Sequence, residues 1–336
     1  MRNMQNRRRP IRIIKASEIK QYFSMQKAID AMETAYACLS SGEGFVPARY
    51  VTALPGDGLI MLFKPAFVQK EKKAAIKILT QRQTGSFEGI PSIMGIVLVI
   101  DADTGEILSI MDGEYLTALR TGAASGIATR YFARKDAETL ALFGCGAQGK
   151  TQLEAVACER DLKKVWIFEK DKSLAEKFID DMQETMNVEM EYTETLQVLN
   201  RVDIICTVTN ATRPLFRKED IKKGVHINAL GSFQPQMQEL DPYLVKEARV
   251  WVDQVEPCLK ESGDLIIPIR EGIIIENHIE GEIGDYILKK IGGRRSEDEI
   301  TIFKSVGVAI QDFVVATQIY ELAVRESFGQ DIDLFE

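Results

Sequence analysis

The sequence predicts an α/β protein in which a doubly wound parallel sheet is joined to a smaller α+β domain. Beyond Asp112, short apolar strands alternate with amphipathic helices, which is typical of a parallel sheet covered on both faces. Before Asp112, apolar runs are separated by glycine, proline and aspartate turns, which favours antiparallel hairpins. Near the end, apolar residues at helical spacing predict a long helix over 301–327 that returns to the first domain.

The first third of the chain predicts one helix among short strands. A strand is expected at Ile11–Ile14, and Ser24 is placed to cap a helix from Met25 to about Ser40, which Gly42 ends. Further strands are expected at Arg49–Leu54, Leu59–Phe63, Ala74–Thr80, Met94–Asp101 and Glu106–Met111, with turns at Pro55–Gly58 and Asp101–Gly105.

The middle of the chain predicts the alternating part. Asp112 is placed to cap a helix that runs to about Phe132. Strands are expected at Thr139–Phe143, Lys164–Phe168, Val188–Tyr192, Asp203–Thr207, Gly224–Ala229 and Arg249–Val252. Helices are expected from the first of these strands to about Cys158, and over Ser173–Met186.

Composition limits the class of protein. The chain has 336 residues, which suggests about two domains, and a net charge of −8, which argues against nucleic-acid binding because phosphate contacts need clustered cations. The near-apolar run Ile90–Ile100 is too short and interrupted to cross a membrane. Residues 1–10 are basic but precede no apolar stretch, so we expect a short tail and not a signal peptide.

The cysteines and histidines give no metal-binding pattern. The five cysteines show no C-x-x-C spacing and are odd in number, which favours a reducing cytoplasm. His226 and His278 are the two histidines, too few for a three-histidine metal site. We therefore expect no metal, and proton chemistry that depends on lysine, carboxylates or the substrate itself.

A glycine loop is the strongest single motif. Gly144-Cys145-Gly146-Ala147-Gln148-Gly149 fits G-x-G-x-x-G, between an apolar strand and a predicted helix. In a Rossmann domain the first glycine permits the tight turn, the second lets backbone amides approach a pyrophosphate, and the third lets the helix pack on the strand. The phosphates then lie at a helix N-terminus. The alternative is a glycine-rich turn without a ligand.

An acidic residue follows the next predicted strand. Glu169 lies 20 residues beyond Gly149, where a carboxylate accepts hydrogen bonds from the adenosine ribose. It would repel a 2′-phosphate, so the cofactor expected is NAD(H). Lys170 follows directly and leaves NADP(H) open.

Separated segments then carry a resemblance. They are Leu116–Ser125, Gly146–Gln152, Ile227–Ser232, Gln238–Pro242 and Ser305–Gly307. Together they resemble the ornithine cyclodeaminase/mu-crystallin family, over about residues 11–323. The resemblance implies hydride transfer between a nicotinamide and the Cα–N bond of a small imino or amino acid. It also implies a Rossmann domain, placed at 116–310, and a discontinuous domain at 1–115 and 311–336 that binds substrate and forms a homodimer.

The resemblance assigns the substrate pocket to three cations. Arg49, Lys77 and Arg120 match its substrate positions, and arginine is a natural bidentate partner for a carboxylate. Strand alternation places Lys77 on one face with Ala75 and Leu79, which argues mildly against open solvent. The resemblance selects Lys77 as the group that binds the carboxylate and assists proton transfer at nitrogen. From the residues alone, each cation could instead lie on a solvated face.

The resemblance also implies cofactor contacts outside the glycine loop. Thr121 would meet the phosphates, Thr207 and Val208 the adenosine, Asn228 to Gly231 the nicotinamide, and Ser305 and Val306 its carboxamide. For Thr207 and its neighbours, an ordinary strand end remains the alternative.

One residue departs from the cyclodeaminase pattern. Phe233 stands where ornithine cyclodeaminases have an aspartate after the Asn-Ala-x-Gly stretch, and a phenyl ring cannot take a proton. Glu239 or Asp241 could replace that acid, although Glu239–Pro242 is typical of a helix start.

The favoured activity is therefore reduction of pyrroline-2-carboxylate or piperideine-2-carboxylate to L-proline or L-pipecolate. The alternatives are an ornithine cyclodeaminase, an amino-acid dehydrogenase of the alanine type, and a crystallin-like protein that binds NAD(P) without turnover.

Overall fold

The computed structural model describes residues 9–56, 58–82, 90–91 and 93–334. The chain divides into two compact units, Met1–Arg120 with Val308–Glu336, and Thr121–Gly307. The predicted basic tail lies mostly in residues 1–8, which are outside the described residues. Asp57 of the predicted turn Pro55–Gly58 is outside the described residues as well.

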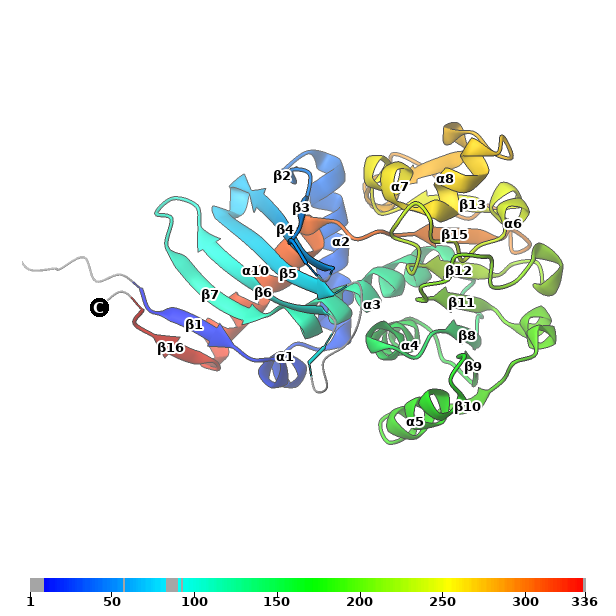
Figure 1. The fold of residues 1–336 in the computed structure, drawn as a ribbon, viewed down its shortest axis with the longest axis horizontal. Coiled ribbons are helices and arrows are strands. Elements are labelled where there is room, and N and C mark those ends of the chain that lie inside the picture. The colour runs from blue at the N-terminus through cyan, green and yellow to red at the C-terminus, as the bar shows by residue number, and fades with distance from the viewer. Residues whose placement is uncertain (1–8, 57, 83–89, 92, 335–336) are drawn as a thin grey trace, which may run out of the picture. The chain divides into compact units, whose positions relative to one another are not determined.

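The first unit contains an eight-stranded, mostly antiparallel sheet of order β16-β1-β7-β6-β5-β4-β2, with β3 paired to β4 (Figure 1). Its strands are β1 (Ile11–Ile14), β2 (Gly44–Phe45), β3 (Tyr50–Ala53), β4 (Leu59–Val68), β5 (Lys73–Arg82), β6 (Ile93–Asp101), β7 (Ile107–Asp112) and β16 (Gln330–Ile332). Each strand predicted for this part is present, and β4 and β5 run longer than predicted. The pairing of β1 with β7 is parallel.

Three helices accompany this sheet, α1 (Ala16–Tyr22), α2 (Met25–Ser41) and α10 (Ala309–Glu326). As predicted, the Ser24 hydroxyl accepts the Lys27 N–H at the start of α2, and Gly42 ends it in the left-handed region. Helix α10 packs against α2 and against β4, β5 and β6 (Figure 1). One face of the sheet is thereby covered by α10.

The predicted helix over 301–327 is partly wrong. Thr301–Lys304 forms strand β15, and the helix starts only at Ala309. Apolar Ile302 and Phe303 fit a fully buried strand as well as a helix, because a short apolar run does not fix its own periodicity. Gly307, at φ +80°, marks the break between the two elements.

The second unit contains an eight-stranded parallel sheet of order β10-β9-β8-β11-β12-β15-β13-β14. Its strands are β8 (Thr139–Phe143), β9 (Lys164–Phe168), β10 (Glu189–Tyr192), β11 (Ile204–Thr207), β12 (His226–Ala229), β13 (Arg249–Val252), β14 (Ile279–Glu282) and β15. The six predicted strands are confirmed. The strand order reverses between β8 and β11, and ligands of such sheets bind at the carboxyl ends beside this reversal.

Helices lie on both faces of that sheet. The chain supplies α3 (Gly113–Phe132), α4 (Ala147–Glu159), α5 (Lys172–Gln183), α6 (Pro242–Glu247), α7 (Val255–Glu261), α8 (Gly263–Arg270) and α9 (Ile283–Ile287). Asp112 starts α3 as predicted, because its Oδ1 accepts the Tyr115 N–H at 2.7 Å. Alternate residues of β8 enter two separate apolar cores, Leu140 and Leu142 one, Ala141 and Phe143 the other. The predicted doubly wound α/β architecture is confirmed.

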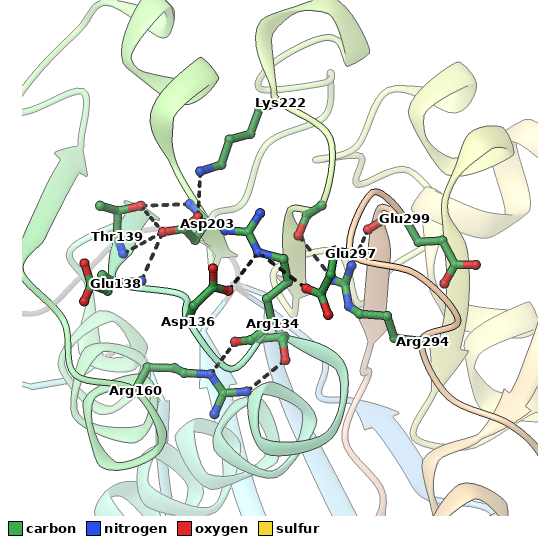
Figure 2. Close-up of polar contacts among 12 residues, drawn as sticks. Arg134, Asp136, Glu138, Thr139, Arg160, Asp203, Lys222, Arg294, Glu297 and Glu299 are labelled. Atoms are coloured by element: carbon green, nitrogen blue, oxygen red, sulfur yellow. Dashed lines mark hydrogen bonds and ion pairs between the residues drawn. The ribbon is translucent and has the colours of Figure 1, made fainter.

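A polar network ties the strands together at their amino ends (Figure 2). Asp203, directly before β11, accepts the backbone N–H groups of Glu138 and Thr139 and the Thr139 hydroxyl. Its other oxygen lies 2.6 Å from both Arg134 Nη2 and Lys222 Nζ. This network therefore stabilises the amino-end edge of the sheet. Cofactors of such sheets bind at the opposite edge, which the carboxyl ends of the strands form.

Among the described helices, none is long and apolar enough to cross a membrane.

Candidate functional site

The glycine loop joins β8 to α4 and has the geometry that a dinucleotide phosphate requires. Gly144 has φ +104°, and a Cβ there would lie 2.9 Å from the carbonyl oxygen of Val208. A Cβ on Gly149 would lie 2.5 Å from the carbonyl oxygen of Gly144. A Cβ on Gly146, by contrast, would meet nothing within 4 Å. Packing requires the first and third glycines, whereas the second leaves its backbone open to a ligand.

The first turn of α4 supplies donors to that open space. Gly146 is its N-cap residue, and no side chain caps the helix. The N–H of Gly149 donates to the Gly146 carbonyl oxygen at 3.0 Å. The N–H groups of Ala147 and Gln148, at the first two helical positions, have no acceptors within the helix, and the helix dipole adds positive potential. This donor set fits the pyrophosphate of a dinucleotide.

Glu169 lies beside the glycine loop. It directly follows β9, and its Oε2 accepts the Cys145 N–H at 3.0 Å while Oε1 accepts the Lys170 N–H at 2.7 Å. The carboxylate is therefore held near the turn, where a cofactor ribose is expected. Burial raises the pKa of the Cys145 thiol to about 12, so this loop cysteine stays protonated.

Thr121 lies where α3 approaches α4. Its carbonyl oxygen accepts Gln152 Nε2 at 3.3 Å. A Cβ on the neighbouring Gly122 would lie 2.3 Å from the Thr151 carbonyl oxygen, so the two helices are in close contact here. The predicted phosphate contact thus lies next to the helix that the glycine loop opens.

The carboxyl ends of β11 and β12 are joined by a residue that sequence analysis assigned differently. Glu239 is fully buried, and its Oε2 accepts the Thr207 hydroxyl at 2.8 Å and the Gly231 and Ser232 N–H groups at 2.8 and 3.2 Å. Its Oε1 accepts the N–H and hydroxyl of Thr209. Glu239 therefore holds together the two loops that carry the predicted cofactor residues Thr207, Val208 and Gly231.

A buried ion pair, Asp264 with Lys304, contacts the backbone at Glu239. Asp264 Oδ1 accepts the N–H groups of Glu239 and Leu240, and its Oδ2 lies 3.1 Å from Lys304 Nζ. Asp264 and Lys304 are both almost completely buried. Burial and the neighbouring Asp264 charge raise the pKa of Glu239, while Lys304 and the Thr209 donors oppose them.

Neither candidate for the missing cyclodeaminase acid is placed to act as one. Asp241 caps α6 by accepting the N–H groups of Tyr243 and Leu244, which confirms the predicted helix start. Glu239 is committed to the two loops described above. Phe233 packs against one of the apolar cores.

The side chain of Asn228 is directed into a buried network. Its Nδ2 donates to Thr129 Oγ1 at 3.0 Å, and its Oδ1 lies 3.2 Å from His226 Nε2. Burial, with a further contribution from Arg294, lowers the pKa of His226 to about 3. His226 is therefore neutral at physiological pH, and its ring is part of the buried hydrogen-bond network. Any nicotinamide contact of Asn228 has to come from its backbone.

Ser305 and Val306 are held by a carboxylate that sequence analysis did not identify. Asp253 Oδ2 accepts the Ser305 hydroxyl at 2.7 Å and the Val306 and Gly307 N–H groups at 3.1 and 2.7 Å. These donors are already used, so toward a carboxamide this segment offers its oxygen acceptors.

Two of the three predicted substrate residues, Lys77 and Arg120, meet in the first unit around Asp312. Lys77 is 1% exposed on β5, and its Nζ donates to Asp312 Oδ1 at 2.7 Å and to Thr117 Oγ1 at 3.2 Å. The predicted shared face with Ala75 and Leu79 is confirmed, because all three side chains are buried.

Arg120 converges on the same carboxylate. Its Nε lies 3.1 Å from Asp312 Oδ1, and its Nη1 donates to Gln311 Oε1 at 2.9 Å. Gln311 in turn donates to the Tyr36 hydroxyl. Sequence analysis missed Gln311 and Asp312, although two adjacent polar residues on the buried face of an apolar helix were a usable signal.

The charges of this cluster change its acid–base behaviour. Burial and the charge of Arg120 lower the pKa of Lys77 well below its usual value, and Lys64 adds to this effect while Asp312 opposes it. Although burial acts in the other direction, Lys77 and Arg120 hold the pKa of Asp312 below its usual value. Lys64 lies directly across the β4–β5 ladder from Lys77 and is also buried.

Arg49 is half-buried directly before β3. Its neighbour Tyr50 pairs with Phe63, which precedes Lys64 in β4. The register therefore brings Arg49 to the stretch of β4 that carries Lys64. The described residues thus provide a loop and helix start that fit a dinucleotide phosphate in one unit, and a buried cation–carboxylate cluster in the other. Within those residues, no group of three histidine, cysteine or acidic side chains could hold a metal ion.

Comparison with known proteins gives matches over nearly the whole chain. The family model of the ornithine cyclodeaminase/mu-crystallin family matches residues 11–327. The Delta(1)-pyrroline-2-carboxylate reductase of Bacillus cereus (strain ATCC 10987 / NRS 248) is 37% identical over 323 residues, 96% of this chain and 99% of the relative.

Two solved structures share both fold and sequence. The Delta(1)-pyrroline-2-carboxylate reductase of Thermococcus litoralis, in complex with NADH and L-proline, has a TM-score of 0.91 and 33% identity, and the match covers 96% of this chain and 100% of that one. An archaeal alanine dehydrogenase dimer with bound NAD has a TM-score of 0.89 and 31% identity, with 97% and 99% covered.

Proposed function

Because the chain belongs to the ornithine cyclodeaminase/mu-crystallin family, we propose that it is an NAD(H)-dependent reductase of cyclic imino acids. The substrates proposed are pyrroline-2-carboxylate and piperideine-2-carboxylate, which yield L-proline and L-pipecolate. The observation that carries this proposal is the buried cluster of Lys77, Arg120 and Asp312, which offers cations to a carboxylate and a proton to a nitrogen.

The second unit is proposed to hold the cofactor, with the glycine loop at the pyrophosphate and Glu169 at the adenosine ribose. The Glu169 carboxylate would repel a 2′-phosphate, which favours NAD(H) over NADP(H). The relatives from Thermococcus litoralis and the archaeal alanine dehydrogenase were solved with NADH and NAD. When bound, NADH supplies a hydride to the carbon of the C=N bond.

The first unit is proposed to bind the imino acid. Arg120, fixed by Gln311 and Asp312, presents a guanidinium to the substrate carboxylate. The ammonium of Lys77 has two of its three donors engaged, by Asp312 and Thr117. Its lowered pKa suits it to give a proton to the imine nitrogen at neutral pH.

Phe233 favours imine reduction over cyclodeamination. Ammonia loss and ring closure need a group that handles the second amino end of ornithine, and no carboxylate stands at this position. Glu239 and Asp241 are both engaged elsewhere.

One set of assays tests the proposed function. NADH and NADPH oxidation is followed with pyrroline-2-carboxylate, piperideine-2-carboxylate, and pyruvate plus ammonia, and ammonia release is followed from ornithine with NAD. We expect turnover with a cyclic imine and NADH. Turnover with pyruvate and ammonia alone, or ammonia release from ornithine alone, would identify one of the alternative activities. NADH binding without any turnover would identify a crystallin-like protein.

The outer face of the first unit's sheet is proposed to bind a second copy of the chain. The face opposite α10 carries a row of apolar residues that lie across from one another on four strands, Tyr50, Phe63, Ile78 and Ile96. Tyr50 is 64% and Ile96 40% exposed, and a broad exposed apolar face of this kind marks an interface. The related alanine dehydrogenase is a dimer.

The compartment proposed is the cytoplasm. All five cysteines are free thiols, and Cys145, Cys206 and Cys258 are buried without a sulfur partner. Fluorescence of a tagged full chain, compared with a cell-surface marker, tests this placement.

A further inference from the structure

We propose that Asp312 is a catalytic residue whose Oδ2 oxygen accepts the N–H of the protonated cyclic imine. The inference rests on the proposed reductase function and assigns a substrate contact that the sequence pattern did not indicate. Asp312 lies in the first turn of α10, on the face that packs against β5 and beside Lys77 and Arg120.

The two oxygens of Asp312 are used unequally. Oδ1 accepts both Lys77 Nζ, at 2.7 Å, and Arg120 Nε, at 3.1 Å. Oδ2 is buried and has no hydrogen-bond partner in the described part of the chain. A buried carboxylate oxygen without a donor costs several times what an ordinary hydrogen bond contributes, so this atom calls for a ligand that donates.

The chemistry of a cyclic imino acid identifies that donor. The substrate has one anionic acceptor, its carboxylate, and one donor, the N–H of its protonated ring nitrogen. Arg120 and Lys77 suit the carboxylate, whereas Asp312 would repel it. The N–H is therefore the substrate group that fits Oδ2, and it forms a charge-assisted hydrogen bond there.

The pair of bonds to Oδ1 fixes the direction of Oδ2. Lys77 and Arg120 restrain one oxygen from two sides, and Gln311 restrains Arg120 through its side-chain oxygen. The direction of Oδ2 is therefore set before the substrate binds, and the chain does not have to move to present it. Such preorganisation is what distinguishes a binding group from a mobile surface carboxylate.

The reaction balances with these residues. A Lys77 N–H bond breaks as the imine N–H bond forms, and Oδ2 accepts that new N–H. A hydride, which NADH would supply on becoming NAD⁺, then bonds to the ring carbon, and the π electron pair of C=N returns to nitrogen as a lone pair. The amine keeps its hydrogen bond to Oδ2, and solvent reprotonates Lys77. Asp312 stays ionised throughout and favours the protonated imine, the form that accepts hydride.

The test compares two ligands that differ at the ring atom. The full chain saturated with NADH is titrated calorimetrically with L-proline, whose ring nitrogen carries N–H donors, and with tetrahydrofuran-2-carboxylate, whose ring oxygen cannot donate. We expect the wild type to bind L-proline about 10- to 100-fold more tightly, and Asp312→Asn to lose that preference. Gln311→Leu is the matched control. It acts through Arg120, so it should weaken both ligands together and keep the preference.

The outcomes separate this inference from the proposed function. Equal affinity of the wild type for the two ligands would overturn the role of Oδ2 without any variant, even if Asp312→Asn fails to fold. An unchanged preference in folded Asp312→Asn would overturn it as well. Asp312→Glu, which keeps the charge, should retain part of the preference. Failure of the wild type to bind either ligand or to reduce a cyclic imine would overturn the proposed function itself.

Discussion

Lys77 Nζ lies 2.7 Å from Asp312 Oδ1, and both side chains are almost completely removed from solvent. The two residues are 235 positions apart in the chain, one on the central strand β5 and the other on the returning helix α10. A buried pair of this kind is a weak source of stability, because desolvation of the two charges offsets most of their attraction. We propose that its value is functional, because it holds a titratable ammonium and a carboxylate at fixed positions.

Replacing Lys77 tests the proton donor. We expect Lys77→Met to reduce kcat for pyrroline-2-carboxylate by about 10²- to 10⁴-fold, because it removes the positioned proton while keeping most of the side-chain volume. Lys73→Met is the matched control, since Lys73 lies on the same strand but pairs with Glu321 at 2.8 Å. It should retain activity. Full activity of folded Lys77→Met would contradict the assigned role.

Only part of this cluster could be predicted from the sequence. Period-2 alternation in β5 places Lys77 on one face with Ala75 and Leu79, which argues mildly against open solvent, and the structure shows this face to be buried. Asp312 was missed because its partner is set by tertiary packing of α10, which no local pattern encodes. Glu239 was assigned to a helix start from its neighbours Asp241 and Pro242, whereas its carboxylate binds loops that lie on other strands.

The same limit explains the error at residues 301–304. A four-residue stretch whose apolar residues are only Ile302 and Phe303 fits a strand inside a parallel sheet and a helix equally well. The deciding fact is that Thr301 to Lys304 pair with both β12 and β13, which are distant in sequence. The glycine loop, by contrast, was predictable because strand, turn and helix are all local.

Replacing Glu239 tests the link between the two cofactor loops. Glu239→Gln keeps the shape but replaces one acceptor oxygen by an amide donor that faces backbone N–H groups. We expect the KM for NADH to rise about 10-fold or more, with a smaller change in the KM for the imine, and a loss of about 1–3 kcal/mol in the free energy of unfolding.

Glu247→Gln is the control for this variant, because Glu247 makes an ion pair with Lys218 at the surface. It should leave both KM values unchanged. Equal rises of the two KM values in Glu239→Gln would indicate general loosening of the unit and not a role in holding the cofactor loops.

Replacing Glu169 tests cofactor choice. Its carboxylate is held beside the glycine loop by the Cys145 N–H, where it would repel a 2′-phosphate. We expect Glu169→Ser to raise the ratio of kcat/KM for NADPH to that for NADH by about 10-fold or more, as expected for loss of a like-charge contact. Steady-state kinetics with both cofactors measure the ratio. An unchanged ratio would place the ribose elsewhere.

Introducing a charged side chain tests whether the outer sheet face of the first unit forms a dimer interface. Stable interfaces bury about 800 Å² per partner and are disrupted by a charge at their apolar centre. We expect Ile96→Glu to shift the mass measured by light scattering from dimer to monomer. Lys72→Glu is the control, because Lys72 pairs with Asp103 at the surface, away from that apolar row. A wild-type monomer at micromolar concentration would contradict the proposed dimer.

The buried histidine predicts how stability depends on pH. Burial lowers the pKa of His226 to about 3 in the folded chain, whereas the unfolded chain has the ordinary value of about 6.5. Between these two values the unfolded state binds more protons, so the free energy of unfolding falls as pH decreases below 6.5. One group of this kind accounts for a loss of about 2 kcal/mol between pH 7 and pH 5.

Urea denaturation at pH 7 and at pH 5 should show this loss in the wild type and in His278→Gln, but a smaller loss in His226→Gln. A wild-type stability that does not change between pH 7 and pH 5 would show that His226 is not held neutral.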